Sequence, residues 1–593
     1  MENQDMVNRL KSVNELDFTP QGEVFPSPRD WRDVFIYFLL VDRFDNNQHN
    51  LPAYDPASTP RGRDPEQGGV FQGGNLKGIV RRLDYLQGLG ANAIWLSPVL
   101  KNRQEKNDTY HGYGIQDFLE VDPRFGTTED LQELVRQAHA RGMYVILDII
   151  LNHTGDNWAY PGDQPYYFWR EARGPFEFGF WRQVDPTAGL QKDDAVWPRE
   201  FQDLDCYKRR GQIRNWNDAD EAIDGDFLSL KELDINQTAV LNSLINAYKY
   251  WIAVTDVDGF RVDTVKHMES SAAAIFCNAI REYAKRIGKH HFFIFGEIVG
   301  DDLTIQRYLG RNSRIEGTTE RFPSLDAALD FPLYFVLEEA IKGFSGPALL
   351  RERYERFRTL YADHGAAGEH FVTFVDNHDQ MVRPYRRFMY QNPYPNQAIL
   401  AIGYLLTSQG VPCIYYGTEQ GFDGGGDHDR YVRECMFGGQ WGAFETVGHH
   451  CFNVEHPIYR AIARIAEIRG REPALRYGRQ YFREISGNGT DFGHPIDGRC
   501  TLAYSRILDE TEIVIAMNLD SEARRDVVTV DAHLSPIGHQ LVNLLDPEER
   551  VTVEQRNNRA AVQVPLGPHA MAILSSKPST RNEEERMAGV EKT

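Results

Sequence analysis

Short apolar runs alternate with amphipathic stretches along most of the chain, and this alternation constrains the fold more than any other feature of the sequence. Eight runs lie between about Val34 and about Arg471, and they are Phe35–Leu40, Ala93–Leu96, Val145–Ile150, Gly259–Val262, Phe292–Phe295, Ala327–Phe331, Phe371–Val375 and Cys413–Tyr416. Strands that are buried on both faces have continuous apolar sequences, and parallel strands need a crossover helix between them. Eight such units predict an α/β fold of the (β/α)8 TIM-barrel type. A doubly wound open sheet is the alternative that counting units leaves open.

The stretches between the runs have the spacing of amphipathic helices. The first, Leu76–Leu89, places its apolar side chains three and four residues apart, which puts them on one helical face. The others with this spacing are Leu131–Arg141, Ala239–Ile252, Ala272–Ile287, Leu349–Tyr361, Gln397–Leu406 and Ile458–Arg469. We expect these helices to form the outer layer of the barrel.

Two segments depart from the alternation and predict further domains. Residues 154–230 are rich in Trp and Tyr amid Gly, Pro and Asp, so we expect an inserted subdomain after the third strand, with the barrel in 30–153 and 231–471. Alternating short runs predict an antiparallel β-sandwich domain over 472–574. Residues 1–29 are then an N-terminal extension, and the polar residues 575–593 predict a disordered tail.

Composition limits the partners of the chain. It holds 65 Lys and Arg against 86 Asp and Glu, a net charge of −21, so we expect no nucleic-acid partner, because phosphate backbones are bound by clustered positive charge. No apolar stretch has the length of a membrane span or the pattern of a secretory signal, which predicts no membrane association and a cytoplasmic location. Six cysteines without CxxC spacing predict free thiols. The oligomeric state stays open.

Acidic residues lie in or just after four of the predicted strands. Asp148 lies in the third run, while Asp263, Glu297 and Asp379 follow the fourth, fifth and seventh. The active site of a barrel lies at the carboxyl ends of its strands, so these side chains are expected to point into one mouth. A single Asp in such a place is more often a helix N-cap or a structural ion pair. Several together indicate a site, because clustered carboxylates are costly unless they titrate, pair or carry chemistry.

Glycoside hydrolysis is a reaction that uses such carboxylates without a Cys cluster or an organic cofactor. One carboxylate attacks the anomeric carbon, and a second, protonated carboxyl group releases the leaving oxygen. Arg261 is two residues before Asp263 on the same strand face and is expected to keep it ionised. Glu297 follows the apolar sequence FFIFG and is expected to hold its proton near neutral pH.

Four segments, DIILNH (148–153), GFRVDTVKH (259–267), FGEIVG (295–300) and FVDNHD (374–379), closely resemble the four conserved segments of the α-amylase family of glycoside hydrolases. YHGYGIQDF (110–118), VDPRFGT (121–127), GDFLSLKELD (225–234) and GVPCIYYGTE (410–419) also resemble segments of that family. The resemblance covers about 34–471. It implies a (β/α)8 catalytic barrel with a protruding domain after the third strand and a C-terminal β domain.

The resemblance also implies roles for individual residues. Asp263 is the expected nucleophile, Glu297 the general acid/base and Asp379 the carboxylate that stabilises the transition state. Retaining double displacement follows, with carboxyl groups about 5–5.5 Å apart. The residues expected to contact sugar or to orient these groups are Tyr113, His153, Arg261, Lys266, His267 and His378. For Lys266, an exposed place at the start of the following helix is the alternative.

A calcium site is a further expectation from the resemblance, since many members tie the protruding domain to the barrel with this ion. Asn152 matches one ligand position and the backbone carbonyl of His267 another. Glu232 stands where the family usually has Asp, which leaves calcium binding open. Asp203 and Asp218 are candidates for the remaining ligand, with a structural role as the alternative.

The resemblance predicts cleavage of α-1,4-glucosidic bonds in starch, glycogen or maltodextrins, with an α-glucan or a maltooligosaccharide as substrate. An α-glucosidase, a maltogenic or cyclodextrin-hydrolysing enzyme, or an α-glucan transglycosylase would use the same residues. A non-catalytic glucan-binding or assembly subunit is the alternative from another class. It is disfavoured because all three acidic residues are present.

Overall fold

The computed structural model describes residues 10–48, 51–54, 65–163, 167–170, 174–185, 187, 193–309, 323–360, 367–379, 384–442 and 448–577. In this part of the chain, six cysteines are free and buried. None of the helices in these ranges combines the length and the hydropathy that crossing a bilayer requires.

Eight parallel strands close into a barrel in the order β1-β15-β13-β12-β11-β10-β5-β2. They are β1 (Ile36–Leu39), β2 (Ala93–Leu96), β5 (Tyr144–Ile149), β10 (Gly259–Val262), β11 (Phe293–Gly296), β12 (Ala327–Leu329), β13 (Phe371–Thr373) and β15 (Val411–Tyr415). Every residue of these strands is buried except Tyr144 at the start of β5, as expected of strands with a packed interior and an outer helical layer. The predicted TIM barrel is therefore confirmed, and the open sheet is excluded by the pairing of β1 with both β2 and β15.

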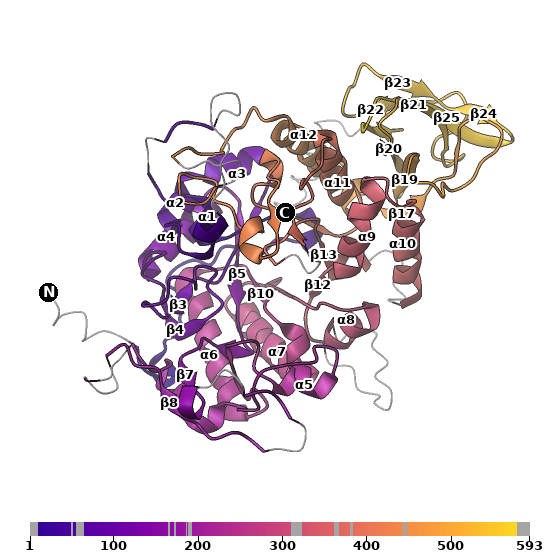
Figure 1. The fold of residues 1–593 in the computed structure, drawn as a ribbon. Coiled ribbons are helices and arrows are strands. Elements are labelled where there is room, and N and C mark those ends of the chain that lie inside the picture. Colours follow the sequence, from indigo (N-terminus) through magenta and orange to yellow (C-terminus); the bar gives the residue numbers. More distant parts are fainter. Residues whose placement is uncertain are drawn as a thin grey trace.

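Helices surround this barrel in Figure 1. They are α1 (Val41–Phe44), α2 (Leu76–Arg81), α3 (Leu83–Leu89), α4 (Thr128–His139), α6 (Thr238–Thr255), α7 (Ser270–Arg286), α8 (Asp302–Leu309), α9 (Phe331–Ile341), α10 (Ala348–Leu360), α11 (Pro395–Thr407), α12 (Pro457–Arg471) and α13 (Pro473–Tyr477). Each predicted helix has a counterpart here. The prediction missed α1, α8, α9 and α13 and treated α2 and α3 as one helix.

One predicted strand was too long. The run Ala327–Phe331 ends as a strand at Leu329, because Asp330 caps helix α9 by accepting a hydrogen bond from the backbone N–H of Leu333 at 3.1 Å. Pro332 follows within the first turn, where its lack of an N–H costs nothing. The apolar Phe331 therefore belongs to the helix, and an apolar run alone could not distinguish the two.

The segment between β5 and α6 protrudes from the barrel, and it carries β7, β8 and α5 along one edge of Figure 1. Its elements are β6 (His153–Thr154), β7 (Trp158–Ala159), β8 (Phe180–Trp181), α5 (Ala219–Asp224) and β9 (Lys231–Glu232). Many of its aromatic side chains pack on one another. Trp158 is fully buried and contacts the rings of Tyr160, Phe178 and Tyr207.

In the described part of the chain, four two-stranded sheets lie outside the barrel, and one of them is the pair β7 and β8. The strands β3 (Leu100–Asn102) and β4 (Ile115–Val121) pair with each other, as do β14 (Tyr385–Arg386) and β16 (Gly425–Gly426). The pair β6 and β9 joins the start of the protruding segment to its end.

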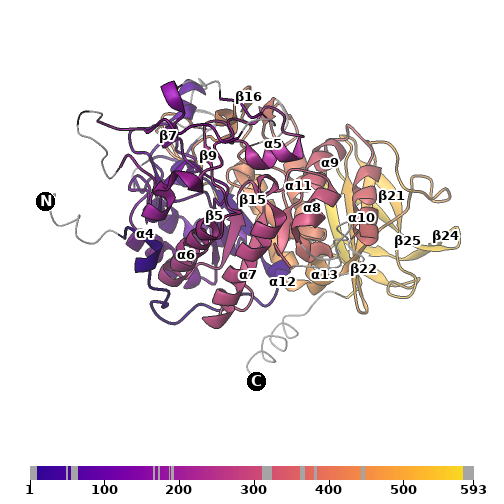
Figure 2. The same cartoon turned by 90° about the horizontal axis from the view of Figure 1, so that it is seen from below.

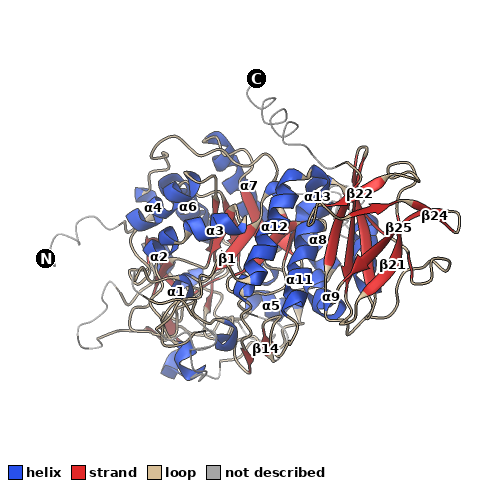
Figure 3. Ribbon diagram, turned by 90° about the horizontal axis from the view of Figure 1, so that it is seen from above, coloured by secondary structure: helices blue, strands red, loops and turns tan. Residues whose placement is uncertain are grey.

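The C-terminal strands form two antiparallel sheets, ordered β17-β19-β20-β26-β22-β23 and β18-β21-β25-β24. They are β17 (Arg479–Phe482), β18 (Ile485–Ser486), β19 (Thr501–Leu508), β20 (Thr511–Asn518), β21 (Arg524–Thr529), β22 (Gln540–Asn543), β23 (Arg550–Thr552), β24 (Glu554–Arg556), β25 (Arg559–Leu566) and β26 (Met571–Ser575). Figures 2 and 3 show this domain at the end of the molecule away from α4. Arg506 joins it to the barrel by donating to the carbonyl oxygen of Thr407 at 2.7 Å.

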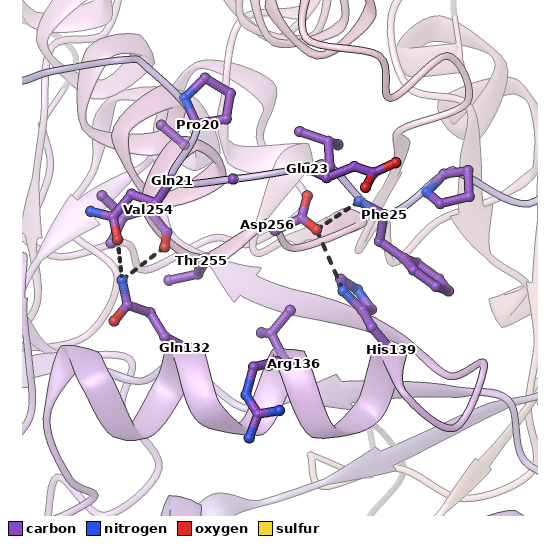
Figure 4. A pocket seen from close by; sticks show the side chains of 15 residues that line it. Pro20, Gln21, Glu23, Phe25, Gln132, Arg136, His139, Val254, Thr255 and Asp256 are labelled. Atoms are coloured by element: carbon purple, nitrogen blue, oxygen red, sulfur yellow. Dashed lines mark hydrogen bonds and ion pairs between the residues drawn. The ribbon is translucent and has the colours of Figure 1, made fainter.

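The described part of the N-terminal extension runs along the barrel. The Phe25 ring stacks on His139 of α4 at 4.1 Å, and its backbone N–H donates to Asp256 at 2.8 Å. A cavity of about 580 Å³ lies between this segment and helices α4 and α6 (Figure 4). Just after the extension, Trp31 stacks on Phe293 of β11. The domain boundaries proposed above stay predictions. Of the predicted tail, residues 575–577 are described and Ser575 is the last residue of β26, while the remainder lies outside the described residues.

Candidate active site

A cleft of about 430 Å³ opens at the carboxyl ends of the barrel strands. It is lined by His111, Tyr113, His153, Phe227, Leu228, Ser229, Leu230, Asp263, Thr264, Glu297, Asp379, Tyr385, Asp429 and Arg433. All three acidic residues predicted to carry the chemistry are among them. The strand ends of a barrel thus bring together side chains that are more than a hundred residues apart in sequence.

Arg261 organises two of these carboxylates. Its Nη1 atom donates to Asp263 at 2.7 Å, and its Nη2 atom lies 3.0 Å from Glu297. Nη1 also donates to Asp148 at 2.8 Å. Arg261 is on β10 two residues before Asp263, so both side chains point to the same face. One fully buried guanidinium therefore fixes the positions of the predicted nucleophile and the predicted acid.

Glu297 directly follows β11, which pairs in register with β10. Besides Arg261, it accepts a hydrogen bond from the backbone N–H of Thr264 at 3.1 Å. Thr264 has a φ of 48°, an unusual conformation for a β-branched residue. This local turn after Asp263 aims an N–H group at the carboxyl group of the neighbouring strand.

Burial raises the pKa of Glu297 more than that of Asp263. It raises the pKa of Glu297 to about 8, although Arg261 opposes the shift. It also raises the pKa of Asp263, but only to about 6, again against Arg261. The two groups titrate as a coupled pair, in which the proton resides mainly on Glu297 between these values. This is the protonation that a nucleophile and a general acid require.

Asp379 is less enclosed than the other two, with a side chain 32% exposed. It is held from two sides, by Arg433 at 2.9 Å and by Nε2 of His378 at 3.1 Å. Burial raises its pKa, while Arg433 opposes the shift. His378 in turn contacts the hydroxyl group of Tyr113 at 2.7 Å, and that hydroxyl donates to Asp148 at 3.0 Å.

Histidines in and beside the cleft are kept neutral. Burial lowers the pKa of His111 to about 4 and that of His153 to about 3, and it lowers the pKa of His378 well below its usual value. Nε2 of His153 is buried, lies 4.0 Å from Asp263 and makes no hydrogen bond within the described residues. A neutral imidazole with a free nitrogen can hydrogen-bond a sugar hydroxyl without adding charge.

Lys266 and His267 lie on a short 3₁₀ turn, Val265–His267, and neither lines the cleft as described. His267 is buried, and its Nδ1 contacts the carbonyl oxygen of Ala222 in α5 at 2.7 Å. Lys266 is half-buried, and its carbonyl oxygen accepts from Tyr308. The sugar contacts predicted for these two residues stay predictions.

Two of the three residues expected to bind calcium, Asn152 and Glu232, contact each other. The side-chain amide of Asn152 donates to Glu232 at 2.6 Å. Asp203 and Asp218, the candidates for a further ligand, instead cap short helices, because each accepts a hydrogen bond from a backbone N–H of the first turn. Among the described residues, no three His, Cys, Asp or Glu side chains are grouped so that they could hold a metal ion.

Sequence reasoning missed Asp429 and Arg433. They lie in the glycine-rich loop after β15. Arg433 joins Asp429 at 2.8 Å to Asp379 at 2.9 Å, so this loop borders the cleft. In the sequence, Asp429 and Arg433 are an acidic and a basic residue four positions apart. This spacing is common on ordinary helices, so it does not by itself indicate a site.

Known proteins resemble this chain in sequence and in fold. The family profile "Alpha amylase, catalytic domain" matches residues 38–436. An "Alpha-amylase" of Streptomyces lividans is 33% identical over 503 residues, which are 77% of this chain and 52% of that protein. A "Cyclomaltodextrin glucanotransferase" of Klebsiella oxytoca is 28% identical over 482 residues, covering 76% of this chain and 66% of that protein. This chain thus spans about half the length of the Streptomyces relative.

A solved structure shows the same architecture. The α-amylase of Geobacillus thermoleovorans, crystallised with acarbose, superposes with a TM-score of 0.66 at 27% identity. The match covers 92% of this chain and 99% of that one.

Proposed function

Since this chain belongs to the α-amylase family, we propose that it is a retaining glycoside hydrolase that cleaves α-1,4-glucosidic bonds in starch, glycogen or maltodextrins. The proposal rests on the guanidinium group of Arg261, which contacts Asp263 through one nitrogen and Glu297 through another. Both carboxyl groups line the same accessible cleft. That arrangement supports a nucleophile and an acid acting on the same bond.

In the first step, a carboxylate oxygen of Asp263 forms a bond to the anomeric carbon of the glucose unit before the scissile bond. The bond from that carbon to the glycosidic oxygen breaks, and Glu297 gives its proton to that oxygen, which leaves as a hydroxyl group of the other fragment. In the second step, Glu297 takes a proton from water, whose oxygen displaces Asp263 from the same carbon. Two inversions restore the α configuration.

The surrounding residues support the positive charge that develops on the sugar ring. Asp379, which is held by Arg433 and His378, is placed to accept hydrogen bonds from sugar hydroxyls. The ring of Tyr113 stacks with that of His378 at a centroid distance of 5.4 Å. Its aromatic face is suited to pack on the apolar face of a glucose unit. Glu297 and Asp263, only 7% and 5% exposed, react away from bulk water.

A transglycosylase is the second candidate, because the relatives include a cyclomaltodextrin glucanotransferase. The chemistry differs only in the acceptor, since a sugar hydroxyl replaces water in the second step. The exposed, apolar Leu228 at the rim of the cleft offers a surface on which an acceptor sugar could pack. The cytoplasmic location expected from the sequence stays a prediction.

The products distinguish these candidates. Incubation with amylose is expected to release mixed maltooligosaccharides early, with reducing ends increasing in proportion to the enzyme, as in endo-acting hydrolysis. Chromatography of a time course on amylose, maltotriose, cyclodextrin and pullulan provides the measurement. Glucose or maltose alone from the start would indicate an exo-acting enzyme, and cyclic or elongated products without new reducing ends would indicate a transglycosylase.

Activity should depend on pH in a bell-shaped manner. Asp263 must be ionised, so kcat/KM is expected to fall as the pH drops below about 6. Glu297 must be protonated, so kcat/KM is expected to fall as the pH rises above about 8. Initial rates with a soluble maltooligosaccharide across pH 4 to 10 test this, after incubation controls for stability. A profile with its maximum below pH 5 would contradict the proposed protonation states.

A further inference from the structure

A buried lysine lies where the protruding segment meets the barrel. Lys208 is 9% exposed, and its ammonium group donates to the carbonyl oxygen of Ile223 at the end of α5. The same nitrogen is 3.5 Å from Glu232 and 3.6 Å from Asp224. Its backbone N–H also donates to the carbonyl oxygen of Glu232 at 3.2 Å. Three oxygen atoms therefore surround one ammonium group.

Glu232 connects this ammonium to the barrel. It is on β9, where His153 is its strand partner, and its second carboxylate oxygen accepts from Asn152. Asn152 and His153 directly follow the last residues of β5. The contacts of Lys208 thus join the segment around α5, the returning strand β9 and the mouth of the barrel through one positive charge.

These residues do not fit a calcium ion. Calcium takes six to eight oxygen ligands at about 2.3–2.6 Å, with carboxylates prominent among them. Here Asn152 turns its NH₂ group, a donor, towards Glu232, and a positive ammonium stands on the other side of that carboxylate. A divalent cation beside Lys208 would be repelled. The side-chain oxygen of Asn152 is a feature in its favour, because it is buried and accepts no hydrogen bond among the described residues. A single bound water would satisfy it equally well.

We propose that the ammonium group of Lys208 is the cation that ties the protruding segment to the barrel, and that this junction needs no metal ion. An ammonium is a compact charge that binds several oxygens at hydrogen-bond distance, and unlike a bound metal ion it cannot dissociate, because it is covalently attached to the chain. The junction should therefore be insensitive to chelators. The proposal concerns stability and does not depend on the reaction that the cleft catalyses.

Thermal unfolding of the full chain tests the proposal. EDTA and millimolar calcium are each expected to leave the Tm of the wild type unchanged within about 1 °C. The Lys208→Met variant keeps the length and the apolar stem but removes the charge, which leaves Glu232 buried without its cation. Its Tm is expected to fall by at least about 4 °C. The matched control is Lys77→Met, which removes a lysine whose side chain is 65% exposed, and its Tm should stay close to that of the wild type.

A second variant distinguishes the ammonium group of Lys208 from a bound calcium ion as the cation at the junction. Lys208→Asn replaces the ammonium by an amide oxygen, so calcium is expected to raise the Tm of this variant but not that of the wild type. A wild-type Tm that drops in EDTA, recovers with calcium and loses this response in Glu232→Gln would place an ion at the junction and overturn the proposal. An unchanged Tm in Lys208→Met would overturn it as well.

Discussion

Asp263→Asn is expected to lower kcat/KM on amylose by at least about 10⁴-fold, the size of loss that follows removal of a nucleophile. The amide cannot form the covalent ester to the anomeric carbon. It nevertheless occupies the same space and can still accept a hydrogen bond from Arg261. The Tm is not expected to fall, because burial raises the pKa of Asp263 and thereby makes its ionised form costly in the folded state at neutral pH.

The matched control for this variant is Asp301→Asn. Asp301 is an exposed carboxylate outside the cleft that accepts a hydrogen bond from Thr304 at the start of α8, and its loss should leave kcat/KM within about twofold of the wild type. Steady-state rates and thermal unfolding are measured on both variants. Near-full activity of a folded Asp263→Asn protein would show that the nucleophile has been assigned wrongly.

Glu297→Ala is expected to lower kcat/KM on amylose by about 10³-fold or more, because no proton reaches the leaving oxygen. The loss should be much smaller on an α-maltosyl fluoride, since fluoride leaves without a proton. The covalent intermediate on Asp263 should then accumulate, because no base activates water. Azide, which needs no base, should restore turnover and give the α-glycosyl azide, identified by NMR.

The configuration of that product makes the experiment specific. Retention at the anomeric carbon requires two displacements, so an α-azide supports Asp263 as the nucleophile and Glu297 as the acid/base. A β-azide would mean a single displacement and would contradict the retaining mechanism. Glu297→Gln is the companion variant, because it keeps the size of the side chain and the hydrogen bond from Thr264 but has no proton to transfer at neutral pH.

The barrel could be predicted from the sequence because its signals are local. Strands buried on both faces leave continuous apolar runs, and the helices between them leave a periodic face. The predictions failed where a local pattern has two solutions. Ala327–Phe331 is apolar throughout, yet only its first three residues are a strand. Helix α9, which starts at Phe331, has apolar residues on most of its surface and so shows little periodicity.

The carboxylates of the site could also be predicted from local sequence signals. Asp263 and Glu297 directly follow apolar runs, and a strand end in a barrel determines where its next side chains point. Most of the residues that contact these carboxylates could not be predicted from local sequence signals. Arg433 contacts Asp379 from a loop 54 residues later, and a side chain in such a loop has no periodicity that would reveal its direction.

The sequence by itself thus determined the barrel, the order of its strands along the chain and the acidic residues at their ends, because these depend on short-range burial and on the geometry of parallel strands. Apart from the pairing of Arg261 with Asp263, which the sequence predicts, only the tertiary structure decided how the charges are paired. The fork of Arg261 reaches Asp148 on β5 and Glu297 beyond β11, and Lys208 meets Glu232 across 24 residues. Electrostatic energy depends on distance in space and on burial, and neither of these can be read from separation along the chain.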